Sequence, residues 1–136
     1  MSAPSQPSPD LFFDTVTAYQ KTAALKAAVD LNLFTVMADG PLTAAEVAAR
    51  CHAAARSTRI LCDYLTVLGF LTKSDDRYSL TPDSAVFLSR KSPAYAGGAA
   101  EFLLSDPLTS AFAHLADSVR KGGTAEPQQD LYAATV

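Results

Sequence analysis

The sequence predicts a mostly α-helical fold with one short β-hairpin, and two segments of the chain carry this prediction. Residues 42–80 have the pattern of two short helices joined by a tight turn, then a strand, a polar tip and a second strand. Residues 11–31 contain neither glycine nor proline and have an alanine-rich centre, which favours one long helix. Together they indicate a winged helix (a helix-turn-helix followed by a short β-hairpin) with added N-terminal and C-terminal helices.

The long helix is expected to begin at Pro9, because Ser8 is a good N-cap and proline suits the first helical position. A helix of about 21 residues is roughly 32 Å long. Its apolar side chains spread over more than half of its circumference, whereas a lone surface helix shows one apolar stripe. We therefore expect one face to pack in its own domain and another against a second chain. Asn32 is expected to end the helix in the left-handed conformation.

The first helix of the helix-turn-helix is expected to start at Thr43, which forms a capping-box pattern with Glu46. It should end near Cys51. His52 follows in the turn and is expected to take a left-handed conformation, since no other histidine or cysteine beyond the adjacent Cys51 lies close enough in sequence to complete a metal site.

The second helix is expected over residues 56–68, ending at Gly69, the residue best suited to a left-handed C-cap. Strands are expected at residues 70–73 and 77–80 on either side of an acidic tip. No alternation of strands and helices is present, so no parallel sheet is expected.

Three helices are expected after the hairpin. Thr81 and Pro82 start a short one, and residues 95–104 form another despite two glycines. The last opens at Asp106 and ends at the glycines that begin with Gly122. Its apolar side chains recur at helical spacing and predict one narrow apolar face. They are Leu108, Phe112, Leu115 and Val119.

DNA binding is the first function to weigh for this fold, and the sequence argues against it. A DNA-reading helix needs exposed basic residues, and usually a basic wing. The chain has a net charge of −3, Asp63 would meet phosphates with the wrong sign, and the hairpin tip is close to neutral. We therefore predict that residues 56–68 are buried and bind no nucleic acid. The apolar residues of that helix are Ile60, Leu61, Cys62, Tyr64, Leu65, Val67 and Leu68.

Composition and length indicate one domain with a short extension at each end. Residues 1–8 are expected to be a disordered leader, residues 9–123 the domain, and residues 124–136 a polar segment. The two cysteines, with no signal peptide before them, predict reduced thiols in a cytoplasmic protein. No apolar run is long enough for a membrane helix.

The residue types that carry catalysis do not form a recognisable set. His114 and Asp117 lie three residues apart, but a general base needs a substrate cleft, and solvated neighbours are the simpler interpretation. Gly97 and Gly98 follow no apolar strand and so lack the context of a phosphate-binding loop. We predict no catalytic, cofactor-binding or metal-ligating residue in this chain.

An ordered set of short motifs resembles the N-terminal dimerisation domain of S-adenosylmethionine-dependent O-methyltransferases, the plant-type and bacterial natural-product group. The likeness covers residues 10–124, with Asn32 and His52 where the family commonly has glycine. The motifs are ALKAAVDLNLF (24–34), GPLTAAEVA (40–48), RIL (59–61), LTVLGFL (65–71), YSLTP (78–82) and SPAYAGG (92–98).

The resemblance implies that this chain is a part of a methyltransferase. In that family, catalysis belongs to a C-terminal Rossmann-like domain, in which a substrate hydroxyl attacks the sulfonium methyl group of S-adenosylmethionine. The chain stops before any such sequence, so residues 124–136 would be a linker toward an absent catalytic domain. No catalytic residue is carried over, and the cofactor is implied for the parent enzyme alone.

The resemblance also implies a homodimer and a share in the acceptor pocket. The dimer would form through the helix at residues 11–29 and through the helices after the hairpin. The acceptor would be a small molecule, an aromatic natural product. A core or interface role is the alternative for Tyr19 and Phe102. The candidate acceptor-binding residues are Phe13, Tyr19, Phe102, Leu103 and Asp106.

Two other function classes stay open from the sequence. One is a small winged-helix transcriptional regulator that is complete as it stands. The other is a stand-alone interaction module that retained the dimer face and lost the enzyme.

Overall fold

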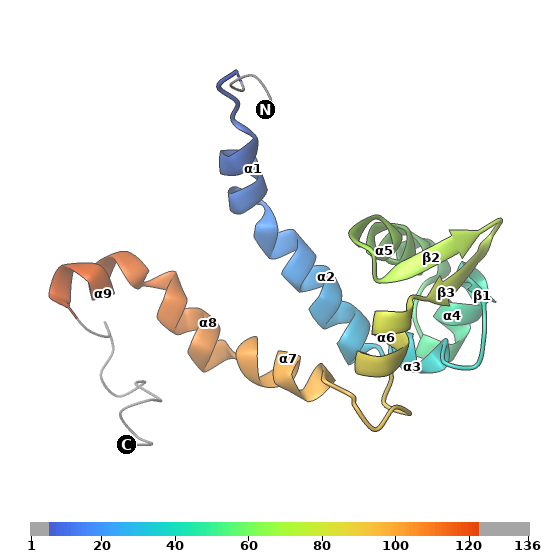
Figure 1. The fold of residues 1–136 in the computed structure, drawn as a ribbon. Coiled ribbons are helices and arrows are strands. Elements are labelled where there is room, and N and C mark those ends of the chain that lie inside the picture. The colour runs from blue at the N-terminus through green and yellow to red at the C-terminus, as the bar shows by residue number, and fades with distance from the viewer. Residues whose placement is uncertain (1–5, 123–136) are drawn as a thin grey trace. The chain divides into compact units, whose positions relative to one another are not determined.

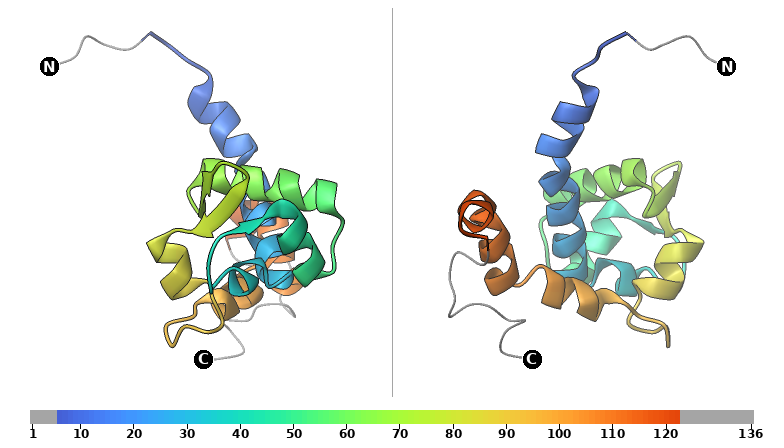
Figure 2. Two further views of the ribbon diagram at one scale, coloured as in Figure 1. Left: turned by 90° about the vertical axis from the view of Figure 1, so that its right-hand side faces the viewer. Right: turned by 60° about the vertical axis from the view of Figure 1, so that its left-hand side comes forward.

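The computed structural model describes residues 6–122, which fall into two compact units divided between Tyr95 and Ala96. The first unit is mostly helical with one small antiparallel sheet, and the second is helical (Figures 1 and 2). The first unit contains α1 (Asp10–Val16), α2 (Ala18–Asp30), α3 (Leu33–Val36), β1 (Leu42–Thr43), α4 (Ala44–Cys51), α5 (Ala55–Leu68), β2 (Leu71–Ser74), β3 (Arg77–Leu80) and α6 (Pro82–Phe87). The second contains α7 (Gly97–Leu103), α8 (Asp106–Ala113) and α9 (Leu115–Lys121).

The N-terminal segment is two helices, so the prediction of one uninterrupted helix is wrong. Thr17 separates them with φ −96° and ψ 1°. The hydroxyl of Thr15 donates to the carbonyl of Leu11 at 2.7 Å, and that of Thr17 to the carbonyl of Phe13 at 2.8 Å. Threonine hydroxyls bonded four residues back are a known cause of helix bending. Figure 1 shows α1 at the N-terminal end of α2, where it extends away from the rest of its unit.

The local signals at the ends of α2, α4 and α5 are confirmed, but the predicted start of the first helix is wrong, because α1 begins at Asp10 and Pro9, not Ser8, is its N-cap residue. The Thr43 N–H donates to Glu46 Oε1 at 2.9 Å and the Glu46 N–H donates to Thr43 Oγ1 at 3.2 Å, which completes the capping box. Asn32, His52 and Gly69 have φ values of 58°, 56° and 101°, the left-handed conformation expected of each. These residues set where α2, α4 and α5 end.

The sheet has one more strand than the sequence predicted. β3 lies between β1 and β2, with Leu42 opposite Tyr78 and Leu71 opposite Leu80. The two predicted hairpin strands are confirmed as β2 and β3. The additional strand β1 is only two residues long and directly precedes α4.

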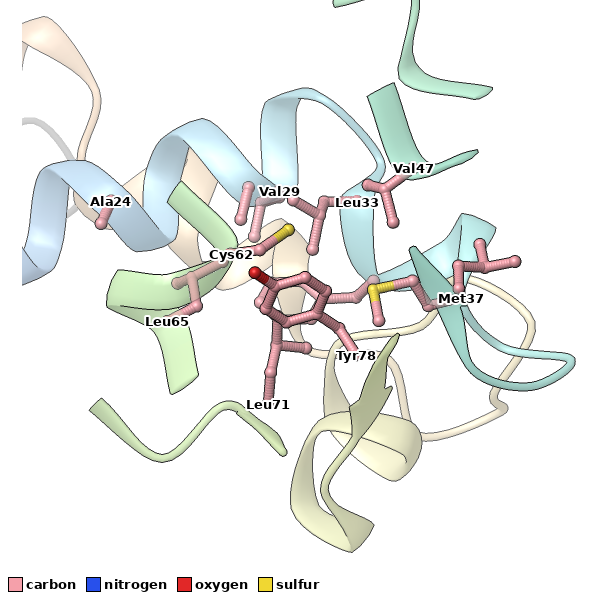
Figure 3. Packing of buried hydrophobic residues seen from close by; sticks show 12 residues of the cluster. Ala24, Val29, Leu33, Met37, Val47, Cys62, Leu65, Leu71 and Tyr78 are labelled. Carbon is pink, nitrogen blue, oxygen red and sulfur yellow. The ribbon is translucent and has the colours of Figure 1, made fainter. Parts of the chain in front are cut away.

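A single apolar cluster joins α2, α3, α4, α5 and the sheet. Figure 3 shows Tyr78 from the sheet among side chains of α5 and β2, including Cys62, Leu65 and Leu71. The tyrosine is only 1% exposed. The buried members are Ala24, Ala28, Val29, Leu33, Phe34, Met37, Leu42, Val47, Cys62, Leu65, Leu71 and Tyr78.

The prediction that the second helix of the helix-turn-helix is buried holds for only one face of α5. Cys62 and Leu65 are fully buried, as expected of a helix that packs on a core. Ile60 and Val67 are 56% and 81% exposed, so their predicted burial is wrong. They lie seven residues apart and therefore on the same outward face.

The helices after the sheet are partly as predicted. The Thr81 side chain caps α6 and accepts a hydrogen bond from the N–H of Ser84. The predicted last helix is divided into α8 and α9 at His114, which has φ −109° and ψ 30°. Leu108 is buried, but the other three apolar residues of the predicted face are more than half exposed. Residues 124–136 lie outside the described residues.

Candidate functional site

Two predicted acceptor-binding residues lie in the N-terminal helices, and both face solvent. Phe13 on α1 is 57% exposed and Tyr19 on α2 is 67% exposed. The ring of Phe13 meets that of Phe12 edge-on, with centroids 5.2 Å apart. Neither candidate belongs to the core cluster, so their side chains are available for contacts outside the unit.

The other three predicted residues lie in the second unit. Phe102 and Leu103 end α7 and are both 61% exposed, and Asp106 is the exposed first residue of α8. The structure thus brings these three together at one helix junction. It places them in a different unit from Phe13 and Tyr19.

The exposed apolar side chains of the N-terminal helices are the most prominent surface feature of the first unit. We call them the α1 apolar surface, and no residue of α1 is buried. Asp10 and Asp14 lie beside them on α1, and neither carboxylate forms an ion pair within residues 6–122. The members of the surface are Leu11, Phe12, Phe13, Val16 and Tyr19, between 53% and 79% exposed.

A groove opens in the first unit between α2 and the end of α5. Its volume is about 290 Å³. The groove is lined by two polar side chains of α2 and by an apolar wall. Lys21, one of the polar residues, forms no ion pair within the described residues. We call it the α2–α5 groove. Its lining residues are Lys21, Thr22, Leu25, Leu68 and Phe70.

A second, more polar groove of about 250 Å³ lies near the end of the first unit. Two of its lining residues, Lys91 and Asp39, form an ion pair at 3.1 Å. None of the five predicted acceptor residues lines either groove. Sequence reasoning missed both because their walls come from segments far apart in the chain. The lining residues are Ala38, Asp39, Leu80, Ala85, Ser89, Lys91 and Ser92.

The outer part of α5 is tied to the hairpin by a small polar network. Asp63 accepts hydrogen bonds from the hydroxyl of Tyr78 and, at 2.9 Å, from the ammonium group of Lys73. These two bonds, that of Tyr78 first, hold the pKa of Asp63 below its usual range. Arg77 pairs with Glu46 at 3.3 Å. Both cations that flank the hairpin tip are therefore engaged by carboxylates of their own chain.

Two residues with possible redox or acid–base chemistry, Cys62 and Asp117, are buried or engaged in an ion pair. Cys62 is buried, and its loss of solvent raises the pKa of its thiol to about 11. Asp117 pairs with Arg120 at 3.1 Å. Within residues 6–122, no three His, Cys, Asp or Glu side chains are grouped to hold a metal ion. No helix in that range is both long and apolar enough to cross a membrane.

Comparison with curated proteins finds methyltransferases of Streptomyces species. The tetracenomycin polyketide synthesis 8-O-methyltransferase TcmO of Streptomyces glaucescens is 34% identical over 113 residues, which are 82% of this chain and 33% of that protein. The N,N-dimethyltransferase OxyT of Streptomyces rimosus is 39% identical over 82 residues, which are 60% of this chain and 24% of that protein. This chain therefore spans about a third or less of the length of these relatives.

Solved structures share the fold. A protein of Nostoc punctiforme, named as a candidate O-methyltransferase, is 52% identical with a TM-score of 0.86, over 89% of this chain and 37% of that one. Human N-acetylserotonin methyltransferase, solved with S-adenosylmethionine, is 29% identical with a TM-score of 0.75, over 90% of this chain and 37% of that one. The family model of the O-methyltransferase dimerisation domain matches residues 13–90, more than half of the chain. The chain therefore belongs to the O-methyltransferase dimerisation domain family.

Proposed function

We propose that this chain is the dimerisation and acceptor-recognition domain of a methyltransferase that transfers the methyl group of S-adenosylmethionine to a hydroxyl of a small aromatic natural product. The observation that carries the proposal is the α1 apolar surface on a chain of this family. We assign the fold to the winged-helix class, with the helices outside residues 42–80 serving dimerisation. Residues 1–8 would be a leader, residues 9–123 the domain and residues 124–136 a linker.

A homodimer accounts for the exposed apolar side chains. Water-exposed apolar patches of this kind mark interaction surfaces. The N-terminal helices carry one such surface, and the second unit carries another, so two parts of the chain offer contacts to a second copy. Obligate dimers of this type typically bury roughly 2,000 Å² or more. The residues of the second unit are Phe102, Leu103, Phe112, Leu115 and Val119.

Acceptor recognition is supported by the chemistry of the candidate residues and by the relatives. Phe13, Tyr19 and Phe102 present aromatic faces on which a flat ring can stack, and the Asp106 carboxylate can accept a hydrogen bond from a hydroxyl. One relative is named for a polyketide and another, from Streptomyces sahachiroi, for a hydroxynaphthoate. An amine acceptor is the second candidate, because OxyT is named an N,N-dimethyltransferase.

The cofactor does not fit the residues described in this structure. S-adenosylmethionine sites of doubly wound domains lie at the ends of parallel strands that lead into a glycine-rich turn. The strands of residues 6–122 form one antiparallel sheet, and a loop, not a strand, precedes the glycines that open α7. We therefore place the cofactor of the whole protein outside these residues.

A DNA-binding regulator has less support. Lys73 and Arg77, the cations nearest the hairpin tip, are paired with Asp63 and Glu46. The outward face of α5 carries Ile60 and Val67 where a reading helix needs polar side chains. We propose that the chain has no nucleic-acid partner and no membrane partner, and that it acts in the cytoplasm.

The molar mass in solution tests the dimer. Light scattering at tens of micromolar should give about twice the 14.3 kDa of the chain. Leu11→Glu should shift the mass toward the monomer, because it puts a charge into the α1 apolar surface. Val67→Glu is the matched control, since Leu11 and Val67 are 79% and 81% exposed. A monomeric wild type, or equal loss with both variants, would contradict the proposal.

Binding of a hydroxynaphthoate tests acceptor recognition. Titration with 3-hydroxy-1-naphthoate should shift NMR resonances of the candidate residues, and 1-naphthoate, which lacks the hydroxyl, should bind more weakly. Phe102→Ala should reduce the shifts, whereas Val67→Ala should leave them unchanged. Absence of any shift at millimolar ligand would contradict recognition by this chain.

A further inference from the structure

We propose that the α2–α5 groove receives Leu11 of a second copy of this chain, in an antiparallel pairing of two α1–α2 segments about a twofold axis at Ala18. The inference rests on the proposed dimer and specifies which residues meet in it. It also gives the α2–α5 groove an occupant.

The groove is small and open for a small-molecule site, and its apolar wall suits an aliphatic side chain. Small-molecule sites usually enclose about 300–1,000 Å³ and bury most of their ligand. At about 290 Å³ and open to solvent on one side, the groove is at the lower limit of that range. Its apolar wall is formed by Leu25, Leu68 and Phe70. Leu11 has the most exposed side chain of the α1 apolar surface, at 79%.

The groove residues of α2 belong to a seam that continues onto α1. Five residues follow one another at alternating steps of three and four, the spacing of a helix face that packs on a second helix. Thr17 between the helices lies in the bridge region, at φ −96° and ψ 1°, but its N–H still donates to the carbonyl of Phe13 at 3.0 Å, so the chain passes from α1 to α2 in a single turn. Ala18 at the centre is small enough to let two helices approach closely. The seam residues are Leu11, Asp14, Ala18, Lys21 and Leu25.

Twofold symmetry then determines which residues meet. In an isologous interface, residue i of one copy contacts residue j of the other, and j contacts i. An antiparallel alignment centred on Ala18 sets Leu11 against Leu25 of the second copy. The same alignment sets Asp14 beside Lys21 of the second copy. Each contact occurs twice, once on either side of the axis.

The charges of the seam select the antiparallel alignment. Asp14 and Lys21 form no ion pair within residues 6–122, and both are exposed. A parallel alignment would set each of them against its own copy, and like charges placed face to face repel. In the antiparallel alignment the carboxylate and the ammonium group are neighbours. The seam is thus complementary to itself, which is why a second copy is the occupant that we assign.

Disulfide trapping at the axis tests the pairing. Ala18→Cys should give a covalent dimer under mild oxidation, because the two new thiols face each other. Ala23→Cys is the matched control, an exposed alanine on another face of α2. The wild type serves as the blank, since desolvation raises the pKa of both native thiols and disfavours their thiolates. Light scattering under reducing conditions is measured on the same samples.

The outcomes distinguish failure of this particular pairing from failure of the proposed dimer. A reduced dimer that crosslinks at residue 18 and not at residue 23 supports the inference. A dimer that crosslinks no better at residue 18 than at residue 23 overturns the pairing and leaves the proposed dimer standing. A monomer of the wild type overturns both.

Charge reversal gives an independent readout. Asp14→Lys and Lys21→Asp should each raise the dimer dissociation constant about tenfold, since each turns two attractive contacts into repulsive ones. The double variant restores opposite charges and should recover most of the affinity. Additive loss in the double variant would overturn the assigned contact, because a merely structural role predicts no rescue.

Discussion

Replacing Phe34 by alanine is expected to lower the free energy of unfolding by about 3–5 kcal/mol. Phe34 is 1% exposed and packs edge-on against Phe70, with ring centroids 6.2 Å apart. The substitution removes this apolar contact and leaves a cavity that the surrounding helices can only partly close. Domains of this size are typically stable by only about 5–15 kcal/mol, so the loss is a large share of the total.

Chemical denaturation followed by far-ultraviolet circular dichroism measures this loss. Phe87→Ala is the matched control, since Phe87 is 49% exposed and should change stability by less than about 1 kcal/mol. Phe34→Leu provides a milder change if the alanine variant does not fold. Equal losses at positions 34 and 87 would show that the core is not where the structure places it.

Removing the Asp63 carboxylate is expected to be the second largest change. Asp63→Ala takes the acceptor from the hydroxyl of Tyr78, a residue only 1% exposed, and from the ammonium group of Lys73. A buried hydroxyl without a partner costs about 1–3 kcal/mol. Asp63→Asn keeps an acceptor oxygen and should lose less. The same denaturation experiment compares the variants, and equal stability of wild type and alanine variant would refute the role of the bond.

The same carboxylate makes the free energy of unfolding depend on pH, and stability is lost at low pH. The pKa of Asp63 is lowered in the folded chain by the bonds from Tyr78 and Lys73. The Asp63 carboxylate therefore binds a proton more readily in the unfolded chain than in the folded chain. Its contribution to the free energy of unfolding is fully present above the unfolded pKa of about 3.9. It is lost as pH falls through the lower, folded pKa. Asp63→Asn should flatten this part of the curve. What remains belongs to other carboxylates, such as Glu46, whose pKa is lowered chiefly by the backbone bond from Thr43.

Much of the fold was predictable because its signals are local. The capping box at Thr43 and the left-handed residues His52 and Gly69 each act within a few residues of their own position. The break between α1 and α2 at Thr17 was not predictable, since neither glycine nor proline marks it. Strand β1 was missed because its two residues become a strand only by pairing with β3, more than thirty residues later.

The orientation of α5 shows where composition misleads. Seven apolar or nearly apolar residues in one helix predicted that all of their side chains point inward, but a helix of this unit has only one face on the core. Cys62 and Leu65 occupy that face, and Ile60 and Val67 do not. The acceptor candidates rested on resemblance alone, and they stay predictions. The grooves left no sequence signal at all, because tertiary packing brings their walls together.

The carboxylate of Glu46 has a consequence for how the first unit folds. One oxygen, Oε1, receives the N–H of Thr43 at the start of α4 and also the guanidinium of Arg77, thirty-one residues later in β3. A local helix start and a distant strand partner thus share a single acceptor atom. Loss of either contact weakens the positioning of the other, which favours an all-or-none transition of α4 and the sheet over stepwise melting.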